Sequence, residues 1–209
     1  MVPYRPAELS SVGTFRLVGK GLARSTLDLC DKVFFLCGWR WYPSRDAWQK
    51  PHEVVMTLSL KADESIADLG AGTGYFSRRF ARHAGKVWAV DIDPKLLAIA
   101  AQGKPTNPEI VLGKADDPGL PAAAVDTIFI CDVWHHIEGR AAYLVKLRKA
   151  LKPGGRIVIV DFKEGKLRVG PPPSMKIMEK ELVGEFAAVG MRASRRHAML
   201  PHQYFLEFR

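Results

Sequence analysis

The sequence predicts an α/β fold built on a doubly wound, mostly parallel seven-stranded sheet, with a helical N-terminal extension. Two observations carry this prediction. Through the middle of the chain, short β-branched runs alternate with helical stretches of about ten residues, which is typical of a parallel sheet covered on both faces. Near the C-terminus, two apolar-alternating segments flank the short break Pro201-His202, which predicts an antiparallel hairpin.

The elements are expected in a regular order. Five parallel strands are expected at residues 65–68, 86–91, 109–112, 125–131 and 155–162. Helices are expected between them at residues 74–83, 94–102 and 139–151. Pro94 suits the first turn of the second helix, and Lys152-Pro153-Gly154 stops the third. A helix at residues 174–189 and hairpin strands at 192–200 and 203–208 complete the sheet.

The 209 residues suffice for one domain, expected at residues 46–209, with an extension at residues 1–45. In the extension, Leu22, Leu29 and Val33 recur at helical spacing while charged residues occupy the other faces, which favours an amphipathic helix. This helix is expected to pack over the domain, with two alternatives: a cap over an apolar substrate, or peripheral membrane contact through residues 22–42. The sequence carries no signal for the oligomeric state.

The composition limits the classes of partner that the protein is expected to bind. Lys and Arg number 31 against 22 Asp and Glu, and a net charge of +9 can attract nucleic acid, anionic lipid or an acidic substrate. The basic residues are dispersed, however, which favours a solvated surface. Three scattered cysteines without a CxxC pair argue against a disulfide framework and against a zinc site, so no metal is expected. No apolar run approaches ~20 residues. The expectation is a cytoplasmic protein without a transmembrane segment.

A glycine-rich loop is the most informative motif. A buried strand ending at Asp68 and Leu69 runs directly into Gly70-Ala71-Gly72-Thr73-Gly74. Glycines let the backbone turn tightly and approach a ligand, at the sheet edge where this architecture binds ligands. Tyr75 stands where the dinucleotide pattern needs its third glycine. The acidic Asp68 fits instead a ligand that carries an ammonium group.

A second acidic residue, Asp91, closes the next strand 19 residues after Gly72. A carboxylate at about this distance accepts hydrogen bonds from both ribose hydroxyls. The alternative role for Asp91 is a helix N-cap ahead of Pro94, which Asp93 fills better. The two motifs together indicate a ligand with a ribose and an ammonium group.

Further segments extend this pattern: Cys131–Ile137 after the fourth strand, Leu151-Lys152-Pro153-Gly154-Gly155, and Val160-Asp161-Phe162. With the glycine loop and Asp91, and in this order, they resemble the class I S-adenosylmethionine-dependent methyltransferases, which have a Rossmann-like fold. The likeness covers roughly residues 46–209 and is greatest to small-molecule methyltransferases of the ubiquinone/menaquinone-biosynthesis type. It implies S-adenosyl-L-methionine as cofactor and S-adenosyl-L-homocysteine as product.

The resemblance also implies a role for each matching residue. Gly70 and Gly72 are expected beneath the methionine portion of the cofactor, Asp91 on the ribose and Ile92 against the adenine. The remaining cofactor residues are expected to be Asp68, Ala71, Ala115, Asp116 and Cys131.

One position departs from that group. Gly113-Lys114-Ala115-Asp116 stands where the group usually shows Gly-Asp-Ala-Glu, whose carboxylate reaches the adenine amino group. Lys114 cannot accept that hydrogen bond, since an ammonium only donates. Asp116 is therefore expected to accept it from two positions later.

The methyl-acceptor side is expected around two adjacent histidines, His135 and His136. Methyl transfer is an in-line displacement, and a hydroxyl or ammonium acceptor must also lose a proton. Histidine is suited to accept that proton near neutral pH. The hypothesis is therefore that His135 or His136 is a general base or a hydrogen-bond partner of the substrate. The alternative is that one packs beneath the loop and the other caps the following helix.

Aromatic residues are the candidates for the acceptor pocket: Tyr75, Trp134, Tyr204 and Trp41. Trp134 has the alternative of a core position. Aromatic density in the N-terminal zone favours an apolar or flat acceptor.

These observations lead to three hypotheses about the function. The preferred one is an enzyme that methylates a small-molecule or lipid-like acceptor. An RNA or protein methyltransferase is the first alternative, motivated by the +9 charge. Against it, the chain has no Asn-Pro-Pro-Tyr motif after the fourth strand and no signature of a nucleic-acid-binding module. The second alternative is a non-catalytic S-adenosylmethionine-binding protein.

Overall fold

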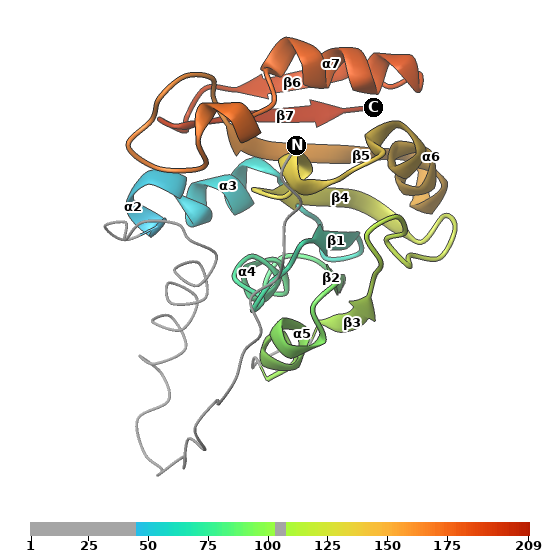
Figure 1. The fold of residues 1–209 in the computed structure, drawn as a ribbon. Helices are drawn as coiled ribbons and strands as arrows, with labels where there is room; N and C mark the ends of the chain where they lie inside the picture. The colour runs from blue at the N-terminus through green and yellow to red at the C-terminus, as the bar shows by residue number, and fades with distance from the viewer. Residues whose placement is uncertain (1–44, 103–107) are drawn as a thin grey trace, which may run out of the picture.

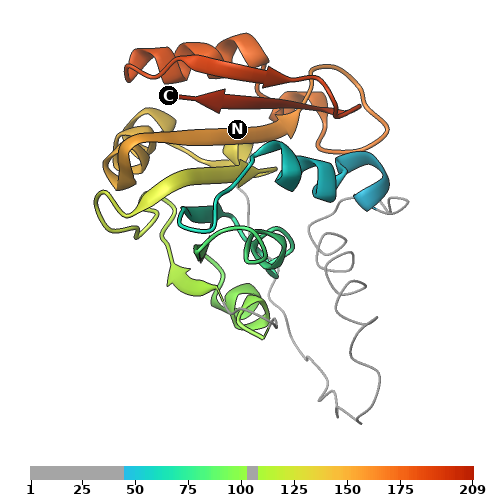
Figure 2. The ribbon, with the colours of Figure 1, turned by 180° about the vertical axis from the view of Figure 1, so that it is seen from behind.

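The computed structural model of the protein describes residues 45–102 and 108–209. A single sheet of seven strands runs through this part of the chain in the order β3-β2-β1-β4-β5-β7-β6 (Figure 1). The strands are β1 Ser65–Leu69, β2 Lys86–Asp91, β3 Glu109–Leu112, β4 Val125–Cys131, β5 Leu151–Phe162, β6 Ala193–His197 and β7 Gln203–Phe208. The first five pair in parallel, while β7 is antiparallel to both of its neighbours. Figure 2 shows β7 inserted between β5 and the edge strand β6. The predicted seven-stranded, mostly parallel sheet is confirmed.

The helices of the described residues are α2 Arg45–Gln49, α3 Pro51–Thr57, α4 Ser77–Phe80, α5 Pro94–Ala100, α6 Arg140–Ala150 and α7 Glu179–Ala188, with 3₁₀ turns η1 Trp134–His136 and η2 Pro173–Met175. The short helices α2 and α3 were not predicted. They are separated by Lys50, which has a left-handed backbone (φ 47°), so no continuous helical period runs through them.

Two predicted helices begin later than expected, for backbone reasons. The helix predicted at residues 74–83 is observed as the single turn α4, and Gly74, with a φ of +84°, cannot be part of a right-handed helix. The helix predicted at 174–189 begins at Glu179, because Met178 has an extended backbone and the proline-rich segment before it forms η2. The prolines thus keep the first part of the predicted segment out of the α-helix.

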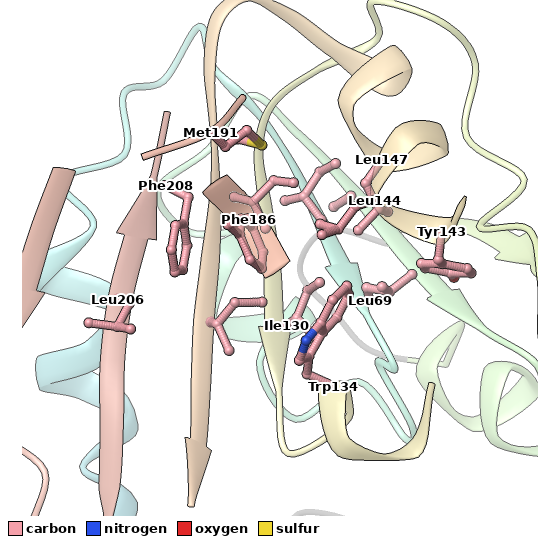
Figure 3. Packing of buried hydrophobic residues seen from close by; sticks show 14 of the residues in the cluster. Leu69, Ile130, Trp134, Tyr143, Leu144, Leu147, Phe186, Met191, Leu206 and Phe208 are labelled. Carbon is pink, nitrogen blue, oxygen red and sulfur yellow. The ribbon is translucent and has the colours of Figure 1, made fainter. Parts of the chain in front are cut away.

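Each face of the sheet carries its own apolar core. On one face, α6 and α7 contribute Leu144, Leu147 and Phe186 to a cluster with strands β4, β5 and β7 (Figure 3). On the other face, α3 and α4 contribute Val54 and Phe80 to a second cluster. The sheet is therefore covered on both faces, as a parallel sheet requires.

The strand order reverses direction between β1 and β4, because β2 and β3 lie on one side of β1 and β5 lies on the other. In open α/β sheets, ligands bind at the carboxyl ends of the strands at such a point. The loop after β1 is tied to the next strand there: the backbone N–H groups of Gly70 and Ala71 donate to the carbonyl of Val90 at 2.8 and 3.0 Å. The fold thus fixes where a ligand-binding crevice lies.

The extension at residues 1–45 lies almost wholly outside the described residues, as do Trp41 and the segment 22–42. The division at residue 45 and the role of that segment therefore stay predictions. Among residues 45–102 and 108–209, no helix has the length and apolar character needed to cross a bilayer.

Candidate functional site

A cavity of about 1100 Å³ opens at the carboxyl ends of the central strands. Its walls come from the loops that follow β1, β2, β3 and β4, at residues 68–73, 90–93, 113–115 and 131–133. Arg45 of α2 and the segment 170–172 after β5 also line it. Segments far apart in the sequence therefore meet at the crevice that the strand order dictates.

The glycine loop forms one wall, and its glycines differ in what they require. Gly70 has a φ of +75°, and a Cβ at this position would lie 2.2 Å from a methyl carbon of Val133. Gly72 has a φ of +55°, and a Cβ there would meet no atom within 4 Å. Gly70 is thus required by the packing of the protein itself, whereas Gly72 borders open space at the cavity.

Asp91 points its carboxylate at this loop from the end of β2. One carboxylate oxygen accepts from the backbone N–H of Gly72 at 2.8 Å, and the other accepts from that of Asp93 at 3.0 Å. The side chain of Asp93 in turn accepts from the N–H of Lys95 and caps α5. The division of roles expected from the sequence agrees with this geometry: Asp93 is the N-cap, and Asp91 lines the cavity.

Asp68 supplies a second carboxylate to the cavity wall. It is buried, with 2% of its surface exposed, and accepts a hydrogen bond from the Ser77 hydroxyl at 2.6 Å. Burial raises its pKa to about 6, because desolvation outweighs the Ser77 hydrogen bond. A carboxylate buried at this cost favours a cationic ligand group, which would restore part of the lost solvation.

The far end of the cavity carries Ile92, Lys114 and Ala115. Ile92 is 63% exposed, which is unusual for a large apolar side chain and suits a flat ring laid against it. Asp116 does not line the cavity: its side chain is 84% exposed and lies 3.8 Å from the ammonium of Lys146. The tight turn made by Lys114 and Asp117 directs Asp116 outward, so its position does not support the expected adenine contact.

The two histidines point to different places. His135 is buried, and its Nδ1 lies 2.8 and 2.9 Å from the two carboxylate oxygens of Asp161 on β5. It does not line the cavity, whereas His136 does. The two rings lie 4.1 Å apart, and desolvation together with neighbouring His135 lowers the pKa of His136. His136 is therefore neutral near pH 7 and able to accept a proton.

The aromatic residues that were expected in the acceptor pocket also lie in different places. Tyr75 lines the cavity and is sandwiched between Arg45 and Arg79, whose guanidinium carbons lie 4.2 and 4.1 Å from its ring centroid. Trp134 lies instead in the core on the α6–α7 face, where Figure 3 shows it, and its indole N–H donates to Glu185 at 2.9 Å. Tyr204 is likewise buried and outside the cavity lining. The core alternative for Trp134 is the one that this position supports.

Several residues at the cavity were not predicted as site residues. Asp132 lines the cavity with a left-handed backbone, φ 59°, and its carboxylate accepts from Gln49 at 2.8 Å, from Gln203 and from Arg45. Its place directly after β4 is the signal that could have found it, since Asp91 ends β2 in the same way. No sequence signal connects it to Gln49, whose helix was not predicted.

The described residues contain no group of three or more histidine, cysteine or acidic side chains placed to hold a metal ion. Cys131 lines the cavity, but burial and the neighbouring Asp132 raise the pKa of its thiol, so it is not a thiolate there. The cavity thus offers carboxylates, an imidazole, glycine backbone and an apolar surface. These suit a nucleoside that carries a cationic group, with room for a second molecule.

Comparisons with known proteins find similarity to methyltransferases. Residues 67–159 match the family model described as a methyltransferase domain. The demethylmenaquinone methyltransferase of Tropheryma whipplei (strain Twist) is 32% identical over 116 residues, covering 54% of this chain and 48% of that protein. The malonyl-[acyl-carrier protein] O-methyltransferase of Serratia marcescens is 33% identical over 50% of this chain and 41% of that protein. The chain thus spans about half, or less, of the length of these relatives.

Solved structures share the fold over more of the chain. A SAM dependent methyltransferase from Aquifex aeolicus has a TM-score of 0.75 at 22% identity, covering 88% of this chain and 96% of that one. The DhpI-SAM-HEP complex has a TM-score of 0.67 at 20% identity, covering 89% of this chain and 93% of that one. At these identities, the likeness shows the fold.

Proposed function

We propose that the chain is a class I S-adenosylmethionine-dependent methyltransferase that transfers a methyl group to a small-molecule or lipid-like acceptor; its residues 67–159 match a methyltransferase domain. The observation that carries the proposal is the hydrogen bond from Gly72 to the Asp91 carboxylate, beside open space at the point where the strand order reverses. S-adenosylmethionine supplies an electrophilic methyl group on a sulfonium.

The residues of one end of the cavity fit this cofactor. In the proposal, Asp91 accepts from the ribose hydroxyls, Ile92 packs on the adenine and buried Asp68 binds the ammonium of the methionine portion. Gly70, Ala71 and Gly72 give the methionine portion a wall without side chains beyond Cβ, and Ala115 and Cys131 complete the lining. The proposed cofactor has no phosphate group. This agrees with the sequence, in which Tyr75 stands where the dinucleotide-binding pattern needs its third glycine.

At the acceptor end, His136 is proposed as the group that takes the acceptor's proton. It lines the cavity and its lowered pKa keeps it neutral near pH 7. His135 is proposed as a positioning residue, because its ring is held by both oxygens of Asp161 and lies 4.1 Å from that of His136, tilted by 46°. Alignment of the acceptor with the methyl group is expected to supply most of the acceleration.

The acceptor class is supported by two features. The relatives named above act, by their names, on demethylmenaquinone and on the malonyl group of malonyl-[acyl-carrier protein]. In this chain, Pro171, Pro172 and Met175 add an apolar wall to the cavity. An RNA substrate gains no such support. A cytoplasmic setting belongs to the same proposal, and membrane contact through residues 22–42 stays an alternative to packing of that segment over the domain.

The experiment that tests this function incubates the purified chain with S-adenosylmethionine labelled in the methyl group and with fractionated cell extract. Label is expected in the small-molecule or lipid fraction. Label found only in the RNA or the protein fraction would contradict the proposed acceptor class. Binding of labelled cofactor with no transfer to any fraction would instead favour a non-catalytic binding protein.

The labelled product also permits a test of His136. Replacing His136 with Gln is expected to lower turnover about 100-fold, because general base catalysis commonly contributes that much or more. Cofactor affinity should stay unchanged. His52 on the exposed face of α3 is a matched control, since its replacement with Gln leaves the cavity intact. Unchanged turnover in His136→Gln would remove the base role.

A further inference from the structure

Asp132 is a buried carboxylate that the proposed cofactor contacts leave unused. Asp132 follows Cys131, the last residue of β4. Its side chain is only 4% exposed, yet it lines the cavity. Burial raises its pKa to about 6, with Asp161 adding to the rise and Arg45, Gln49 and His135 opposing it. A carboxylate in such surroundings is retained at a cost in stability, which favours a role in function.

Side chains from two distant elements hold this carboxylate in place. The Gln49 amide of α2 donates to one oxygen at 2.8 Å, and the Gln203 amide of β7 donates to the other. Gln49 also donates to Gln203 at 3.1 Å, so the two amides form one clamp. Arg45 approaches the first oxygen at 3.4 Å. Both oxygens are therefore oriented by donors that lie outside the glycine loop.

The backbone of Asp132 is also strained. Its φ of 59° is left-handed, a conformation that costs ordinary residues about 1–2 kcal/mol and that Asp and Asn tolerate best. Non-glycine residues held in this region cluster at functional sites. Here the turn brings the carboxylate to the cavity wall between Cys131 and Val133, both of which also line the cavity.

Three donors among the described residues reach the carboxylate, which leaves about one of its four acceptor positions for a ligand. Asp68 and Asp91, by contrast, lie at the glycine loop and face the expected amino-acid and ribose groups. Asp132 and His136, the residue proposed to accept a proton, both line the cavity. The lining thus includes a carboxylate and an imidazole that the proposed cofactor contacts leave unused.

We infer that Asp132 binds the O–H or N–H group of the methyl acceptor, so that the acceptor is a hydroxyl or an amine and the transfer is to oxygen or nitrogen. This inference rests on the proposed function. In the step, a lone pair of the acceptor heteroatom forms the bond to the methyl carbon, and the carbon–sulfur bond breaks with its electron pair left on sulfur. Asp132 stabilises the positive charge that develops on the heteroatom, and the proton leaves to His136.

Ligand binding tests this without knowledge of the acceptor. Sinefungin is a cofactor analogue with an amino group in place of the transferred methyl, and its ammonium stands in for the charged acceptor heteroatom. S-adenosylhomocysteine has no charge at that position. Calorimetry at pH 7.5 on the wild type is expected to show tighter binding of sinefungin than of S-adenosylhomocysteine.

The variant Asp132→Asn keeps the shape of the side chain and tolerates the left-handed backbone. It is expected to lose at least tenfold in sinefungin affinity while S-adenosylhomocysteine affinity changes less than threefold. Asp63→Asn, an exposed carboxylate outside the cavity lining, is the matched control and should change neither affinity. Equal weakening of both ligands, or no change in either, would overturn the role of Asp132.

A second measurement uses the unmutated chain, in case Asp132→Asn folds poorly. Lowering the pH from 7.5 to 5 protonates Asp132, and the preference for sinefungin over S-adenosylhomocysteine should fall several-fold. Arg45, His135 and Asp161 act on the same carboxylate. His136 also lines the cavity and can gain a positive charge as the pH falls, so the titration is repeated with His136→Gln, in which the fall in preference should persist. A preference that does not change with pH would contradict the inference. Failure of the wild type to bind S-adenosylhomocysteine at all would contradict the proposed function itself.

Discussion

The two ends of the cavity are built in different ways. The end that includes Asp68, the glycine loop and Asp91 comes from one β-loop-α-β unit, and Gly72 and Asp91 are 19 positions apart. The end around Asp132 brings together α2, the loop after β4 and β7, and its clamp joins residues 154 positions apart. At the first end the backbone of the glycine loop forms the wall and is fixed by close packing, whereas at the second end the side chains of Gln49 and Gln203 hold the carboxylate of Asp132.

This difference predicts how each end responds to substitution. Backbone conformation at the glycine loop is fixed by close packing, so a single methyl group is expected to be costly there. The clamp around Asp132 depends on hydrogen bonds to a buried charge, each of which contributes less and depends on pH. Substitutions at the two ends therefore measure separately how much close packing and how much hydrogen bonding to a buried charge contribute to the stability of the fold.

The largest effect is expected from Gly70→Ala. The added Cβ would lie 2.2 Å from Val133 at a φ of +75°, so left-handed strain of about 1–2 kcal/mol adds to overpacking of about 1–3 kcal/mol. Urea unfolding should show a free energy of unfolding lower by about 3 kcal/mol. Gly72→Ala is the matched control, with no atom within 4 Å, and should lose only about 1 kcal/mol. Equal losses would show that contact with Val133 does not matter.

The next effect concerns ligand affinity. Asp91→Ala removes the proposed acceptor for the ribose hydroxyls and leaves the N–H groups of Gly72 and Asp93 without this partner. Calorimetry should show S-adenosylhomocysteine affinity lower by about 10- to 100-fold, because hydrogen bonds to charged groups are worth about 1.5–3 kcal/mol. Asp93→Ala removes the N-cap of α5 and should lower stability more than affinity. The reverse pattern would exchange the roles assigned to the two residues.

Asp68→Asn should stabilise the ligand-free protein. The pKa of Asp68 is raised to about 6 in the fold and is about 3.8 in the unfolded chain, so the folded state holds the proton more tightly. Stability of the wild type therefore falls as the pH rises from about 4 to about 6, and stays lower above that. At pH 7.5 the Asn variant should be more stable by about 1 kcal/mol, with weaker cofactor binding. Thermal unfolding from pH 4 to 8 measures this, and a difference that persists at pH 4 would contradict it.

The smallest effect is expected at the clamp. Gln203→Leu removes one donor to the Asp132 carboxylate, which raises its pKa further and destabilises the folded state wherever the group is ionised. The free energy of unfolding should fall by about 1 kcal/mol at pH 7.5. The loss should shrink at pH 5, below the folded pKa, since a protonated carboxyl needs the donor less. A loss of equal size at both pH values would mean that Gln203 acts through packing alone.

The sequence by itself determined the sheet and indicated the proposed cofactor end of the cavity. Strands 86–91, 109–112, 125–131 and 203–208 were predicted with the bounds observed, because β-branched runs flanked by turn residues depend on local chemistry. The glycine loop and Asp91 could be recognised for the same reason: they lie on one continuous stretch, where spacing along the chain translates directly into position in space.

Only the tertiary structure decided which side chains face the cavity at its other end. His136 lines it while adjacent His135 pairs with Asp161, and Trp134 turns into the core, although all three stand in one short motif. The 3₁₀ turn η1 and the left-handed backbone of Asp132 set these directions, and neither has a reliable signature in the sequence. The clamp of Gln49 and Gln203 depends on β7 lying beside β5, which is a long-range pairing that no local pattern specifies.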